Sequence, residues 1–156
     1  MSTNKPLKSE LTLHWVILGA MLLMLVSYNI ICHTIGTEIR IKLPEEQLIF
    51  IRSILYVVTI ILFPLTNLLR HILLRLNQTM PGHSPAKNRY LITTMVTLAC
   101  IEIVGLFGFV MFMLGDVYNS LYIFTTLAVL GLFLHRPREQ ELRQITEALE
   151  INSNNN

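Results

Sequence analysis

Long apolar runs dominate this chain and alternate with short polar segments. Four of these runs are long enough to form helices that cross a membrane, and they cover residues 11–35, 48–74, 90–114 and 117–135. A helix needs about 20 mainly apolar residues to span the roughly 30 Å hydrocarbon layer of a bilayer. The pattern therefore predicts an all-α integral membrane protein in which four transmembrane helices form an antiparallel bundle.

Composition agrees with this pattern. Hydrophobic residues make up 53% of the 156 residues and charged residues 14%, whereas soluble domains carry about 25% charged residues. Most of the basic residues lie outside the apolar runs, and the chain shows no signature of a nucleic-acid-binding protein. We therefore expect its partners to be the lipid bilayer and other membrane-protein subunits, or further copies of itself.

The distribution of lysine and arginine predicts the orientation. Nine of these residues fall in or next to the two tails and the middle loop, and three (Arg40, Lys42 and Arg52) fall on the opposite side. Cytoplasmic loops carry the excess of basic residues, so both termini are expected in the cytoplasm. We predict a bacterial-type inner-membrane protein with a cytoplasmic tail (residues 1–10), a membrane domain (11–135) and a cytoplasmic C-terminal segment (136–156).

The C-terminal segment changes character after the last apolar run. Within "HRPREQELRQITEALEI", Leu142, Ile145 and Leu149 recur at helical spacing, which predicts a short amphipathic helix. Such a helix can lie at the lipid headgroups or dock on a cytoplasmic partner, and the sequence leaves both roles open. The final "NSNNN" is predicted to be disordered.

One acidic residue interrupts the third apolar run. Glu102 lies about 18 Å from the predicted cytoplasmic edge of its helix, near the middle of the membrane. An ionised carboxylate is costly there, so it should be protonated, paired or facing water, and it marks a candidate functional site. Arg52 and Tyr56 in the second run are its expected partners. A structural role and a role in proton or ion transfer both remain open.

Small residues surround this acid. Ala99, Gly105 and Gly108 fall at helical spacings from Glu102, and small residues let neighbouring membrane helices approach closely. We expect these three positions to form a helix-packing strip.

The stretch "LACIEIVGLFGFVMFML" (residues 98–114) resembles the carboxylate helix of the proteolipid c subunit of rotary ATP synthases. In that family an acid is followed at a fixed distance by an aromatic-glycine pair and an aliphatic run, here Glu102, Phe107, Gly108, Phe109 and Val110. The resemblance covers about seventeen residues of 156. It implies that Glu102 carries a translocated proton.

Three histidines fall near the predicted cytoplasmic boundary, namely His14, His71 and His135. Imidazoles from two helices can hold a haem b iron, and three can hold a metal. Histidines at the ends of membrane helices can also simply meet the headgroups. We expect no cofactor and keep haem b as the alternative.

The sequence carries no glycine-rich phosphate loop, nucleophile elbow or zinc-protease motif. We therefore predict a small non-catalytic membrane protein, either an accessory or assembly subunit of a larger inner-membrane complex or a homo-oligomer. Proton or ion translocation through Glu102 is the second hypothesis, and electron transfer through haem b is the third.

Overall fold

Every regular element in the described part of the chain is a helix. The computed structural model describes residues 7–79 and 85–154. In chain order the helices are α1 (Leu7–Thr34), α2 (Gly36–Ile39), α3 (Glu45–Thr79), α4 (Ala86–Met113), α5 (Tyr118–Leu134) and α6 (Glu139–Asn154). The all-α prediction is confirmed for these residues, because each predicted apolar run coincides with one long helix.

Three of the helices are long and apolar enough to cross a membrane: α1 from Leu11 onward, α3 and α4. Helix α5 has 17 residues and meets the same criterion only together with α6, from which it is bent by 44°. The described chain therefore has three helices that can cross a membrane, or four if α5 and α6 count as one bent span.

Prolines and one glycine mark the helix ends. Pro44 directly precedes α3, and Pro85 directly precedes α4. Proline has no backbone N–H, so it is tolerated where a helix begins and its first amides lack partners. Gly115 follows α4 with a φ of 109°, a left-handed conformation that glycine adopts without the steric penalty of a Cβ atom. This residue allows α4 to turn back tightly into α5.

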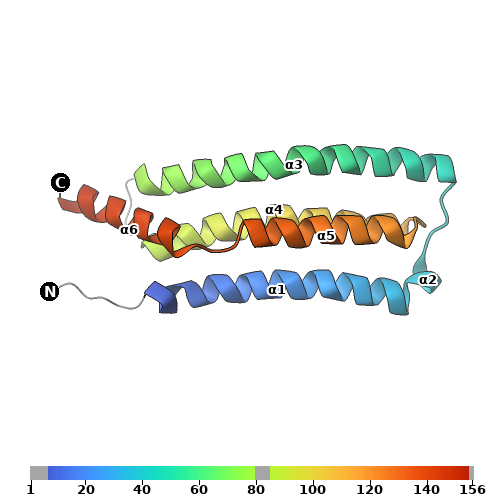
Figure 1. The fold of residues 1–156 in the computed structure, drawn as a ribbon, viewed down its shortest axis with the longest axis horizontal. Coiled ribbons are helices and arrows are strands. Elements are labelled where there is room, and N and C mark those ends of the chain that lie inside the picture. The colour runs from blue at the N-terminus through green and yellow to red at the C-terminus, as the bar shows by residue number, and fades with distance from the viewer. Residues whose placement is uncertain (1–6, 80–84, 155–156) are drawn as a thin grey trace.

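Helices α1, α3, α4 and α5 run alongside one another along the length of the molecule (Figure 1). Helix α4 contacts each of the other three. Half of its most apolar stretch (50%) is buried, compared with 17% for α1 and 11% for α3. Helix α4 is therefore the central helix, and α3 is the one whose surface is least covered.

The main apolar core lies where α4 meets α1 and α5. Leu98 and Ile101 of α4 pack there with Leu25 of α1 and with Phe124 and Ala128 of α5, and all five are almost completely buried. Burying such side chains against one another at close packing holds the helices in one register.

Helix α6 docks on the other helices through its apolar stripe. Leu142 and Ile145 are fully buried in a cluster with Leu11 and Tyr90, and Leu149 packs against that cluster. The apolar stripe of α6, which we expected to contact lipid headgroups or a partner, is thus covered by the protein's own helices. Helix α6 also continues to Asn154, so residues 152–154 of the expected disordered tail are helical, while residues 155–156 lie outside the described residues.

Candidate functional site

Glu102 lies near the middle of α4, about 18 Å along the helix axis from Tyr90 and about 16 Å from Met113. Its side chain is buried, with 8% of the residue exposed. Both carboxyl oxygens are buried, and neither has a hydrogen-bond partner among the described residues. An unpaired buried carboxyl group is costly unless it carries a proton.

The face of α4 that carries Glu102 packs against α1. Gly105 and Phe109 lie three and seven residues further on, on the same face of the helix. A Cβ atom on Gly105 would overlap the side chain of Leu25, and the Phe109 ring lies 5.3 Å from the ring of Tyr28. The surroundings of the carboxyl group are therefore mainly apolar.

Arg52 does not pair with Glu102, contrary to the sequence-based expectation. Its Nη2 atom lies 2.8 Å from Oδ1 of Asp116, and the backbone N–H of Val117 donates to the same oxygen at 2.8 Å. Side chains of a helix lean toward its N-terminus. Because α3 and α4 are antiparallel, Arg52 leans toward the turn that contains Asp116, and Glu102 leans toward the opposite end.

Tyr56 is also engaged elsewhere. Its ring stacks on Phe124 of α5, with 4.9 Å between the ring centroids. The structure therefore separates the three residues that we expected to form one site. Glu102 has no hydrogen-bond partner among the described residues, while Arg52 and Tyr56 contact different parts of the α4–α5 hairpin.

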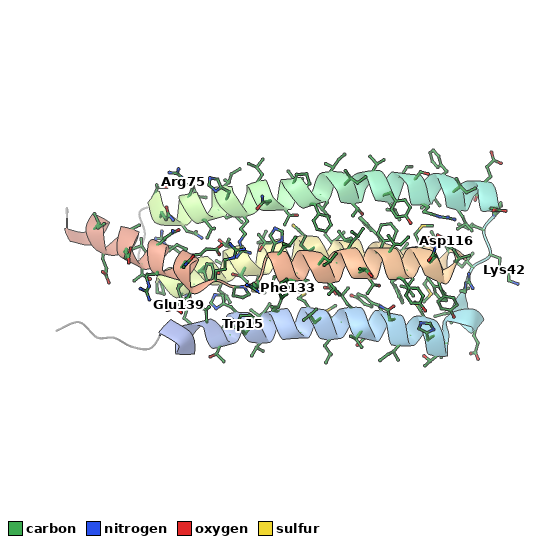
Figure 2. All side chains as sticks on the ribbon, viewed as in Figure 1. Trp15, Lys42, Arg75, Asp116, Phe133 and Glu139 are labelled. Carbon is green, nitrogen blue, oxygen red and sulfur yellow. The ribbon has the colours of Figure 1, made fainter. Side chains whose placement is uncertain are left out.

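Asp116 belongs to a polar cluster at the end of the molecule where α4 turns into α5 (Figure 2). Arg40 donates from Nη2 to the carbonyl oxygens of Gly115 and Asp116 at 2.7 and 2.5 Å. The backbone of Ile41 donates to Met113 at 2.8 Å. These bonds fasten the segment between α2 and α3 to the α4–α5 turn.

Two of the three expected helix-packing residues lie in a helix interface. A Cβ atom on Gly108 would lie 2.9 Å from Cβ of Phe124 in α5, and one on Gly105 would overlap the side chain of Leu25 in α1. Ala99 is exposed instead. It points away from the neighbours that Gly105 and Gly108 touch. Of the three residues predicted to form a helix-packing strip, only these two glycines pack against another helix.

At the opposite end of α3, Arg70 forms a second polar cluster. Its Nη2 atom lies 2.6 Å from Oε2 of Glu141 in α6, and Nη1 donates to the carbonyl oxygen of His135 at 2.7 Å. The Tyr90 hydroxyl donates to the same Glu141 oxygen at 3.0 Å and accepts from the backbone N–H of Arg138 at 2.8 Å. This cluster joins α3, α4 and α6.

Sequence reasoning missed this cluster. Arg70 was only one of the nine basic residues that indicated the orientation, and Tyr90 was given no polar role. One feature of the sequence could have indicated it. Arg52 and Arg70 lie at the two ends of the uncharged middle of α3, about 27 Å apart along the helix axis. Arginines at both edges of a membrane-length apolar run need polar partners or headgroups.

The three histidines differ in their surroundings. The ring of His14 is buried against Tyr90, with 4.9 Å between centroids. Nδ1 of His135 lies 2.9 Å from the carbonyl oxygen of Gly131, and His71 is exposed on α3. In the part of the chain that the structure describes, no three histidine, cysteine or acidic residues are grouped closely enough to hold a metal ion.

A pocket of about 400 Å³ opens between α3 and the junction of α5 and α6. We call it the Arg70 pocket, and it is lined by Phe63, Pro64, Asn67, Arg70, Leu134, His135, Arg138 and Glu141. It lies beside the bend at which the chain leaves α5 and enters α6.

Comparison of the chain with protein families, with curated proteins and with solved structures found no match. We therefore infer the function from the polar clusters, the pocket and the exposed helix surfaces of this chain.

Proposed function

We propose that this protein is a bacterial-type inner-membrane protein with four transmembrane helices and both termini in the cytoplasm. Helices α1, α3 and α4 have the required length and apolarity. Helix α5 runs alongside them, and α1 and α6 begin at the same end of the molecule (Figure 1), as an even number of crossings requires. The 27 Å between Arg52 and Arg70 agrees with a hydrocarbon layer of about 30 Å.

Within that membrane, we propose a non-catalytic role as an accessory or assembly subunit of a larger complex, or as a homo-oligomer. The observation that supports this role is the surface of α3, of whose most apolar stretch only 11% is buried. Ile60 is 71% exposed there and Phe50 66%. Large exposed apolar surfaces serve contacts with lipids or with other proteins.

The surface of α3 is a better candidate for partner contacts than the glycines of α4 or the apolar stripe of α6. The buried glycines of α4 and the apolar stripe of α6 are used within the chain, so neither remains available to a partner. We therefore place the partner surface on the outer face of α3.

Photo-crosslinking in intact membranes tests this role. A photoreactive residue at Ile60 should give one reproducible protein adduct, with the mass of two chains for a homo-oligomer or a larger defined mass for a complex. The same residue at Thr59, which is 2% exposed, is the matched control and should give only internal products. Adducts with lipid alone at position 60 would refute the role.

The second candidate is proton transfer at Glu102, and one observation favours it. The carboxyl group is buried near the middle of α4, and neither of its oxygens has a hydrogen-bond partner among the described residues. The arginine expected to neutralise it is bound to Asp116. A midplane carboxyl group with no structural partner can take up and release a proton.

Proteoliposomes separate the two candidates. If Glu102 carries protons, the purified wild-type protein should dissipate an imposed pH gradient faster than its Glu102→Gln variant, which keeps the side-chain volume but has no titratable group. Equal rates in the two proteins, both equal to empty liposomes, would rule out proton transfer by the isolated chain.

A further inference from the structure

The Arg70 pocket is polar at one end and apolar at the other. Arg70, Asn67 and Arg138 line its polar end, together with His135 and Glu141. Phe63 and Pro64 lie about two helical turns before Arg70 in α3, toward the middle of the membrane span. With Leu134 they form an apolar floor. The two halves are ordered as the headgroup and acyl chains of a lipid are ordered in a leaflet.

The polar end keeps an uncompensated positive charge. Arg70 is 6% exposed and is paired with Glu141 at 2.6 Å. Arg138 is exposed, and its guanidinium group forms no hydrogen bond or ion pair with the described residues. Its backbone is nevertheless fixed, because its N–H donates to Tyr90 at 2.8 Å. An exposed guanidinium group without a protein partner can donate two parallel hydrogen bonds to a phosphate group.

We infer that the Arg70 pocket binds an anionic phospholipid, with Arg138 contacting the phosphate group and an acyl chain lying over Phe63, Pro64 and Leu134. Basic pockets between membrane helices at the cytoplasmic side are suited to such headgroups. The apolar floor distinguishes this ligand from a free phosphate ion, which would gain nothing from it. The inference rests on the proposed membrane arrangement but not on any partner protein or on proton transfer.

Native mass spectrometry of the full-length protein in mild detergent tests the inference. Phosphatidylglycerol and phosphatidylcholine with the same acyl chains are added in equal amounts, and the retained lipid is counted for each variant. The wild type should retain phosphatidylglycerol preferentially. Arg138→Gln should reduce that retention about fivefold, as expected for the loss of one basic residue near the headgroup.

Arg143→Gln is the matched control, because it removes the same charge from α6 but lies outside the pocket, where Arg143 pairs with exposed Glu139 at 3.2 Å. It should retain phosphatidylglycerol as the wild type does. Equal losses in both variants would show diffuse attraction and overturn the inference.

Displacement of the lipid by millimolar inorganic phosphate would also overturn it, because the site would then be one for free phosphate. If no anionic lipid is preferred while the Ile60 adduct still forms, only the lipid site fails.

Discussion

Arg70 of α3 and Glu141 of α6 form an ion pair of 2.6 Å in which both side chains are largely buried. These residues are 71 positions apart in the sequence. Their pairing makes the C-terminal helix part of the helical assembly, although the sequence suggested a separate cytoplasmic segment.

Glu141→Gln should destabilise the protein, because the Arg70 charge would then lack its partner. Removing one member of a buried pair costs about 3 kcal/mol, and α6 should become sensitive to proteolysis before the other helices. Thermal unfolding in detergent and limited proteolysis measure the two effects. Glu139→Gln, which breaks the exposed pair with Arg143, should change stability by less than about 0.5 kcal/mol. Similar losses in both variants would contradict the role of the Arg70–Glu141 pair.

A double-mutant cycle tests the pairing of Arg52. Arg52→Leu and Asp116→Leu should each lower stability, and the double variant should recover part of the loss because neither change then leaves an unpaired charge. Arg52→Leu combined with Glu102→Leu should instead show effects that add, since these residues do not touch. Coupling between positions 52 and 102 in chemical denaturation would restore the pairing first expected from the sequence.

Glu102→Leu should leave the stability unchanged or raise it. The carboxyl oxygens have no hydrogen-bond partner among the described residues, so the substitution removes a buried polar group whose burial costs about 1–3 kcal/mol. Thermal unfolding of the wild type, Glu102→Leu and Glu102→Gln in the same detergent provides the comparison. A clear loss of stability in the leucine variant only would mean that Glu102 has a structural hydrogen bond.

Gly108→Ala should destabilise the α4–α5 contact. The new methyl group would lie 2.9 Å from Cβ of Phe124 and 3.1 Å from the backbone oxygen of Leu121, and neither atom can move without shifting α5. Overpacking of this kind costs about 1–3 kcal/mol. Gly19→Ala is the control, because nothing lies within 4 Å of its added Cβ, and it should gain up to about 1 kcal/mol from helix propensity. Equal behaviour of the two variants would contradict the packing of Gly108.

The helices could be predicted from the sequence because their cause is local. A membrane-length apolar run bounded by prolines and charges has few alternatives to a helix, and α3 and α4 lie close to the predicted ranges. The polar contacts could not be predicted in the same way. Arg52 and Glu102 were matched by depth alone, but their contact also depends on the rotation of each helix and on the direction in which the side chains lean.

The dependence of contacts on how the helices are arranged also explains why the expectations for Ala99 and for α6 were wrong. Ala99 shares a spacing with Gly105 and Gly108, yet it lies on an exposed face because the position of the neighbouring helices decides which part of a strip is covered. The apolar stripe of α6 was identified correctly. Its partner was not, because the cluster of Leu11 and Tyr90 that it covers exists only after α1 and α4 have come together.

The separation of Arg70 from Glu141 has a consequence for biosynthesis. Chains are made from the N-terminus onward, so α3 is complete long before Glu141 leaves the ribosome. During that interval the Arg70 guanidinium group lacks its protein partner and must be solvated by water or, in the proposed membrane arrangement, contacted by anionic lipid headgroups. A chain truncated before residue 141 would keep Arg70 in that state permanently, because it would lack both Glu141 and the helix α6 that carries it.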